Sequence, residues 1–116
     1  MGANIKRIKL ANTYAEDEIS RSSINFVKGK DVGADYFNSC DLGTYLSGGD
    51  VPQHVHDDIE EVFYFLRGTG VVYLDKKEIP VKAGSVVPVP PGVYHGIKNT
   101  GRDVLQHLVC SAKVKK

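Results

Sequence analysis

Four side chains in two short segments of the sequence are of types that bind divalent transition metals: His54, His56, Glu61 and His95. The first three lie within residues 48–68 and the fourth within residues 84–99, among glycines and prolines spaced like the ends of hairpins. Neutral imidazoles and a carboxylate suit a first-row divalent ion and leave open positions for water or substrate in an octahedral shell. The sequence therefore predicts one divalent transition metal ion per chain, with iron, manganese, nickel, zinc and copper as the candidates.

The spacing of these residues indicates the elements that must hold them. His54 and His56 are two residues apart, so on one β-strand both side chains leave the same face. Pro52 fits the start of that strand, where a missing amide hydrogen costs little. Glu61 lies an odd number of residues after His56, so we expect the chain to turn at the polar step 57–58.

Glu61 has a competitor for the ligand role in its neighbour, Glu60. Glu61 shares a strand face with Phe63, whereas Glu60 would face the opposite way, and we therefore prefer Glu61. His95 follows a Pro-Pro-Gly corner at residues 90–92, which would place it at the beginning of a separate strand.

The rest of the chain reads as short β-branched or aromatic runs separated by Gly, Pro and Asp. The expected strands cover residues 36–46, 53–56, 61–67, 70–74, 78–81, 85–89, 95–99 and 104–111. Short strands with turn signals at this spacing predict an all-β sandwich or barrel. We expect the barrel over residues 34–112, a basic tail at 113–116, and an N-terminal arm over 1–33. The arm would carry a short strand at Phe26–Val27 and pack on the barrel or on a dimer partner.

Composition narrows the class of protein. Hydrophobic residues make up 41% of the 116 residues and charged residues 25%, as in a single globular domain. The formal net charge of +1 gives no argument for a nucleic-acid or membrane partner. No apolar run approaches the roughly 20 residues that span a bilayer, and the first residues lack the apolar core of a signal peptide. We therefore expect a cytoplasmic protein with a small-molecule substrate.

Two cysteines, Cys40 and Cys110, are too few and too far apart in sequence to predict a disulfide framework or a CxxC redox centre. A cytoplasmic location makes two reduced, buried thiols the default expectation. A disulfide between them stays open as the alternative.

The two segments together resemble the two motifs of the cupin superfamily. Their patterns are Gly48-x5-His54-x-His56-x4-Glu61-x6-Gly68 and Gly84-x5-Pro90-x-Gly92-x2-His95-x3-Asn99. The resemblance implies an antiparallel double-stranded β-helix, or jelly-roll barrel, that holds the metal inside and commonly forms a homodimer. It makes the two histidines of the first motif, Glu61 and His95 the metal ligands, the glycines and Pro90 turn formers, and Asn99 a structural residue at a strand end.

The fourth histidine, His107, is the candidate for acid/base chemistry or substrate contact beside the metal. Its unperturbed pKa of about 6.5 suits proton transfer. Small cupins with the same separation from the last ligand place this face of the final strand inward; with the opposite register His107 is a surface residue and Gln106 takes its place. One or two barrel aromatics are also expected to line the cavity, from the set Tyr45, Phe63, Phe65, Tyr73 and Tyr94.

The function we expect is that of a metal-dependent dioxygenase acting on a small oxygenated organic substrate, because three histidines and a glutamate resemble the ligand set of cupin dioxygenases. Two alternatives stay open beside this first function. The second is a redox-neutral isomerase, lyase or decarboxylase acting on a sugar acid or small carboxylate, with the metal as Lewis acid. The third is a non-catalytic module that binds a small ligand. One scaffold hosts many reactions, so the fold alone does not choose among them.

Overall fold

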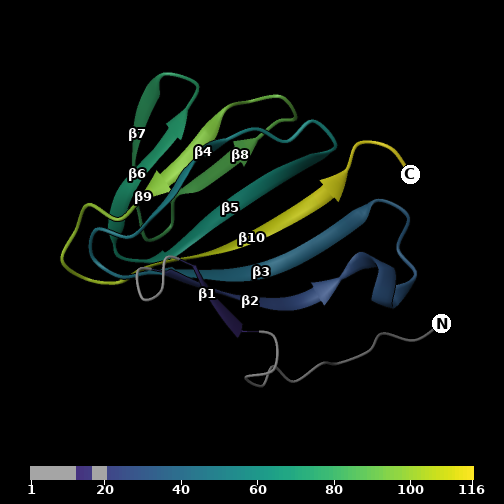
Figure 1. Cartoon of the computed structure of the whole chain (residues 1–116), viewed down its shortest axis with the longest axis horizontal. Helices are drawn as coiled ribbons and strands as arrows, with labels where there is room; N and C mark the ends of the chain where they lie inside the picture. The colour runs from purple at the N-terminus through teal and green to yellow at the C-terminus, as the bar shows by residue number, and fades with distance from the viewer. Residues whose placement is uncertain (1–12, 17–20) are drawn as a thin grey trace.

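The chain folds into two antiparallel β-sheets, and the computed structural model describes residues 13–16 and 21–116 (Figure 1). The six-stranded sheet has the order β1 (Thr13–Glu16), β2 (Arg21–Lys28), β3 (Phe37–Tyr45), β10 (Leu105–Lys113), β5 (Ile59–Arg67) and β8 (Val86–Val89). The four-stranded sheet has the order β4 (Asp50–His54), β9 (His95–Lys98), β6 (Thr69–Leu74) and β7 (Lys77–Lys82). A short 3-10 helix, η1 (Gly29–Val32), connects β2 to β3. The predicted all-β antiparallel barrel is confirmed.

Within the described part of the chain, no helix has the length and apolar character needed to span a lipid bilayer.

The first metal-ligand segment differs from the prediction in one respect. β4 begins at Asp50 and ends at His54, so Pro52 lies inside the strand and His56 lies beyond its end. The prediction that both histidines belong to one strand is therefore wrong. Pro52 is tolerated because β4 is an edge strand and because its pairing with β9 shifts register between Val51 and His54.

The N-terminal part contributes more to the sheet than a short strand. β2 is eight residues long where a strand at Phe26–Val27 was expected, and it pairs with both β1 and β3. Residues 1–12 and 17–20 of the expected arm lie outside the described residues. Packing of this segment on a partner, and the homodimer itself, stay predictions.

The core lies between the two sheets and follows the alternation of the strands. On β5, Phe63 and Phe65 are buried and Tyr64 and Leu66 are exposed. Among the residues that the structure describes, the buried hydrophobic ones are Tyr45, Phe63, Phe65, Val72, Val81, Val87, Val89, Ile97 and Leu105. Phe65 and Leu105 are completely buried, and burial of side chains of this size contributes about 1.5–3 kcal/mol each.

Gly68 makes the crossing from the six-stranded to the four-stranded sheet, between β5 and β6. Its φ of 87° lies in the left-handed region that favours glycine. A β-carbon at this position would lie 2.2 Å from the carbonyl oxygen of Val104. Both the turn and the close approach of the chain before β10 therefore require glycine here.

Asn99 fixes the end of β9, in the structural place that the resemblance implied. Its side chain is 1% exposed, and its Nδ2 donates to the carbonyl oxygens of Tyr45 (3.0 Å) and Asp103 (2.9 Å). Its Oδ1 accepts a hydrogen bond from the Gly101 amide at 3.0 Å. One buried amide thus joins the end of β3 to the turn that leads into β10.

The two cysteines lie side by side, although 70 residues separate them in sequence. Cys40 on β3 is the direct cross-strand partner of Cys110 on β10, and their sulfur atoms are 3.4 Å apart. Cys40 is half-buried and Cys110 is exposed, so the expectation of two buried thiols is wrong. The distance between the two cysteines in the sequence does not predict this contact, because it depends on the pairing of β10, the last strand, with β3.

The basic tail begins within the last strand, since Lys113 belongs to β10. The Lys113 amide donates to the Tyr36 carbonyl at 2.7 Å, and the Val114 amide donates to the Asp58 carbonyl at 3.1 Å. The start of the tail is therefore held against two loops of the barrel.

Candidate metal centre and its cavity

Three histidines from different parts of the chain meet at one place inside the barrel. A nitrogen from each of His54, His56 and His95 lies within 4.8 Å of the others. His54 and His95 are direct cross-strand partners at the end of β4 and the beginning of β9. His56 reaches the same place from the segment after β4, where its carbonyl accepts a hydrogen bond from the Gly92 amide at 2.7 Å. The corner at residues 90–92 therefore positions both His56 and the strand that carries His95.

Backbone hydrogen bonds orient two of the three imidazoles. The Nδ1 atoms of His54 and His95 each lie 2.8 Å from a carbonyl oxygen, of Pro52 and of Val93 respectively. A carbonyl only accepts, so each Nδ1 carries the proton and each Nε2 presents its lone pair. Metal-binding histidines commonly show this arrangement, because the hydrogen bond fixes both the tautomer and the ring orientation.

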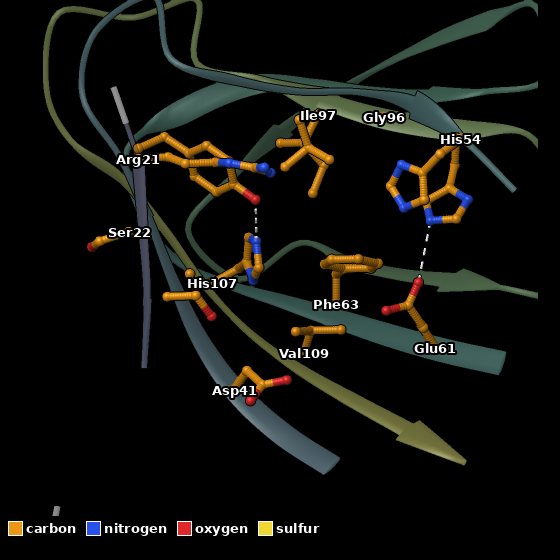
Figure 2. A pocket seen from close by; sticks show the side chains of 15 residues that line it. Arg21, Ser22, Asp41, His54, Glu61, Phe63, Gly96, Ile97, His107 and Val109 are labelled. Atoms are coloured by element: carbon orange, nitrogen blue, oxygen red, sulfur yellow. Dashed lines mark hydrogen bonds and ion pairs between the residues drawn. The ribbon is translucent and has the colours of Figure 1, made fainter. Parts of the chain in front are cut away.

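Glu61 faces the histidines from β5 in the opposite sheet. Its Oε1 lies 3.2 Å from the Nε2 of His95 and 3.9 Å from the Nε2 of His56. Glu60 is exposed on the other face of the strand, as the alternation predicts. The structure thus brings together all four side chains that the sequence selected. Figure 2 shows two of them, His54 and Glu61, on the same side of the cavity.

The three histidines lie close enough together to hold one metal ion, and Glu61 lies beside two of them. The Oε1 of Glu61 and the Nε2 of His95 are buried and make no hydrogen bond, although they face each other. Two lone-pair atoms in this position need either a shared proton or a cation. Three imidazole nitrogens and one carboxylate oxygen form a donor set that first-row divalent ions accept.

The electrostatics of the histidines agree with this donor arrangement. Burial lowers the pKa of His54 below its ordinary value, which keeps this imidazole neutral and able to bind a cation. For His95 burial also acts to lower the pKa, but the Glu61 carboxylate and the Val93 carbonyl outweigh it and raise the pKa. The site therefore attracts positive charge at the point where His95 meets Glu61.

Three of the four metal candidates, His54, Glu61 and His95, line one side of a cavity of about 190 Å³. Figure 2 shows His54 and Glu61 at that side and His107 at the other, with Phe63 between them. Arg21 of β2 also lines the His107 side. The cavity thus has a metal-binding side and a second polar side across an aromatic ring.

His107 faces into this cavity from β10. It is 3% exposed, and its Nε2 lies 2.8 Å from the hydroxyl of Tyr45. Burial lowers its pKa to about 4, against a smaller opposing effect of the Glu61 charge, so the imidazole is neutral at pH 7. Gln106 lies on the other face of β10, where its amide donates to the Thr44 hydroxyl at 3.2 Å. The alternative with Gln106 in the cavity is therefore wrong.

Two residues around His107 escaped the sequence reasoning. Tyr45 was expected only as one of several barrel aromatics, and its hydrogen bond to His107 depends on the pairing of β3 with β10. Gly43 was not considered, yet it lies directly opposite His107, and a β-carbon there would lie 2.5 Å from the imidazole Cε1. A glycine inside a strand was the available signal, because it marks a close approach by another group.

Comparisons with known proteins place the clustered histidines, Glu61 and His107 within one matched region. The family model described as a cupin domain matches residues 42–110. An oxalate-binding protein of Thermotoga maritima is 39% identical over 61 residues, which cover 53% of this chain and 50% of that protein. Auxin-binding protein 1 of Arabidopsis thaliana is 38% identical over 77 residues, which cover 59% of this chain and 38% of that protein. The alignments thus span half or less of the length of these two relatives.

A solved structure shares the fold over most of its length. The crystal structure of a predicted oxalate decarboxylase from Thermotoga maritima has a TM-score of 0.76 and 26% sequence identity, and the match covers 81% of both chains. The family match includes the three clustered histidines, Glu61 and His107, and it extends over more than half of the chain. The chain belongs to the cupin family.

Proposed function

We propose that this cupin is a metal-dependent, redox-neutral enzyme that acts on a small carboxylate or sugar acid. The observation that carries the proposal is the hydrogen-bonded pair of His107 and Tyr45, which faces the same small cavity as His54 and His95. A buried neutral imidazole beside a hydroxyl is suited to moving a proton on a substrate, as isomerases, lyases and decarboxylases require.

Each group in the cavity has a distinct role in this proposal. His54, His56, His95 and Glu61 hold a divalent ion, which supplies Lewis-acid polarisation of a substrate oxygen when bound. The Nε2 of His107 accepts a proton that arrives through the Tyr45 hydroxyl, and the reverse transfer returns it. Phe63, between the two sides, excludes water from the path and so limits loss of the proton to solvent.

The size of the cavity and the position of Arg21 in it support a small acidic substrate. A volume of about 190 Å³ accommodates only a compact molecule. Arg21 contributes a guanidinium to the side opposite the metal candidates, and this group suits a substrate carboxylate. The sequence and structure matches in Thermotoga maritima are described as an oxalate-binding protein and a predicted oxalate decarboxylase, which is consistent with a small carboxylate.

The test must separate this reaction from an O2-dependent one, since cupin dioxygenases use a similar ligand set. The metal-loaded protein is incubated in D2O under strict anaerobiosis with small hydroxy acids, keto acids, dicarboxylates and sugar acids, and products are followed by NMR. We expect turnover without oxygen and deuterium in the product. Tyr45→Phe and His107→Gln should each lower kcat by about 100-fold, the usual range for loss of an acid/base group, with little change in KM.

Three results would contradict the proposal. Turnover that stops when oxygen is removed would favour the dioxygenase, and unchanged kcat in both variants would remove the proton-transfer role. Tight binding of a carboxylate that is never converted would favour the non-catalytic module.

A further inference from the structure

The paired cysteines lie outside the metal cavity and have no part in the proposed reaction. Cys40 and Cys110 are opposite each other on neighbouring antiparallel strands, with their sulfur atoms 3.4 Å apart. Both are free thiols. Their contact is separate from the site formed by the histidines.

The backbone geometry of this pair is compatible with a covalent bond. Directly opposite residues of an antiparallel pair have Cα atoms about 4.5 or 5.5 Å apart, and disulfides span about 4.4–6.8 Å between Cα atoms. Neither strand therefore has to move far for the two sulfur atoms to bond. The bond would close a loop between positions 70 residues apart in sequence.

One of the two thiols is open to small molecules. Cys110 is exposed and borders a shallow surface groove of about 370 Å³, which Val62 and Pro88 also line. Cys40 is less accessible, and burial, followed by its interaction with Cys110, raises its pKa to about 11. The exposed thiol is thus the one that an external reagent meets first, and the half-buried thiol is held within reach of it.

We propose that Cys40 and Cys110 are a thiol pair that forms a reversible intramolecular disulfide by exchange with a low-molecular-weight disulfide such as oxidised glutathione. The Cys110 thiolate attacks the glutathione disulfide, releases one glutathione thiolate and carries a glutathionyl group on its sulfur. Cys40 then loses its proton to solvent and attacks the Cys110 sulfur, and the second glutathione leaves as a thiolate. The two cysteines lose two electrons in total, and the glutathione disulfide gains them.

The bond would clamp the two strands that position His107. Three residues along the same ladder from Cys40 and Cys110, Gly43 faces His107. A bond that fixes this register restricts the unfolded chain strongly because the loop it closes is long. The oxidised form is therefore the more stable form of the protein.

The test treats the full-length, metal-loaded protein with oxidised glutathione at low protein concentration and follows intact mass, peptide mapping and thermal unfolding. We expect a monomer lighter by two hydrogen atoms and a cross-linked peptide that contains both cysteines. Its Tm should rise by roughly 10 °C and return to the starting value with dithiothreitol. Closure should also speed up with pH, because the thiolate is the nucleophile.

Matched serine variants divide the reaction into its steps. With oxidised glutathione, Cys40→Ser should carry a single glutathionyl adduct on Cys110 and react no further. Cys110→Ser should form no cross-link, and its Tm should be the same before and after the treatment. Three results for the wild-type protein would overturn the proposal: a stable glutathionyl adduct like that of Cys40→Ser, a disulfide between two chains, or no reaction at either thiol. The serine changes are small and Cys110 is exposed, so both variants are expected to fold.

Discussion

The imidazole of His107 lies over Gly43, its direct partner across β10 and β3, and fills the space that a side chain would need. A β-carbon on Gly43 would come within 2.5 Å of the imidazole Cε1 and 2.7 Å of Nε2. On its other sides the ring meets Phe63 and Phe65 edge-on, with centroid separations of 4.9 and 5.5 Å. The orientation of His107 toward the Tyr45 hydroxyl is therefore set by packing as well as by a hydrogen bond.

Gly43→Ala should displace this imidazole and destabilise the fold. Overpacking of a filled site costs about 1–3 kcal/mol. The measurement is the free energy of unfolding in urea, for Gly43→Ala alone and in a His107→Ala background. The cost of the alanine should fall sharply when the imidazole is absent, and an equal cost in both backgrounds would show that the contact with His107 is not responsible.

Glu61→Gln should weaken metal binding strongly, whereas Glu60→Gln should leave it unchanged. Glu61 faces two of the histidines, and Glu60 is exposed on the opposite side of β5. We expect an affinity loss of more than about 100-fold for Glu61→Gln, beyond the usual effect of changing a residue that only supports a ligand. His95→Ala should behave in the same way.

Two measurements test these variants. The first is the metal content of each protein after purification without chelators. The second is the rise in Tm when metal is added, since a ligand that binds only the folded state stabilises that state. Equal losses for the two glutamine variants, or full metal content in His95→Ala, would contradict the four-ligand site.

The positions of the strands and the inward face of β5 could be predicted from the sequence because they depend on local patterns. Glu61, Phe63 and Phe65 alternate with exposed residues, and an alternation of period two identifies the shared face wherever the strand lies. The turn glycines likewise depend on local backbone geometry; Gly68, for example, has a positive φ. The meeting of the two histidine segments with Glu61 was reached through the motif resemblance and not through these local patterns.

The contacts that the sequence did not reveal are those made between β3 and β10. The hydrogen bond from Tyr45 to His107, the approach of His107 to Gly43, and the contact of the cysteines all require the register of two strands that are distant in sequence. No local pattern in either strand specifies that register. The place where β4 ends was also missed: pairing with β9 stops at His54, and the carbonyl of His56 instead accepts a hydrogen bond from the Gly92 amide.

Asn99→Ala should lower the free energy of unfolding by more than the replacement of a single polar side chain usually does. The substitution leaves the Tyr45 and Asp103 carbonyls and the Gly101 amide without the partner that Asn99 provides. Loss of these buried hydrogen bonds should lower the free energy of unfolding by about 2–4 kcal/mol. Asn38→Ala is the matched control, because that half-buried amide donates one hydrogen bond to Ser111 at 2.9 Å. Urea unfolding of both variants tests the difference, and equal costs would show that Asn99 does not hold the end of β9.

The protein should lose stability as the pH falls, because His107 is buried as a neutral imidazole. Its pKa in the folded protein is about 4, against 6.5 for the free side chain, because burial disfavours the charged imidazole. Between these two pKa values the unfolded chain binds more protons than the folded one. The contribution of the neutral His107 to the free energy of unfolding is therefore fully present above pH 6.5 and is lost as the pH falls towards 4. The loss should reach about 3 kcal/mol.

His107→Gln isolates this effect, because glutamine can keep a hydrogen bond to Tyr45 but does not titrate. Tyr45 and the charged residues Glu61, Arg21 and Asp41 share the cavity with His107 and are retained in the variant. The free energy of unfolding of both metal-free proteins is measured in urea at a series of pH values. The effects of the other titrating groups are the same in both proteins, so they cancel in the difference between the two free energies. The wild-type protein should lose about 3 kcal/mol more than His107→Gln between pH 6.5 and 4. Parallel stability curves would mean that His107 takes up its proton as easily in the folded chain as in the unfolded one, and the buried neutral imidazole would then be wrong.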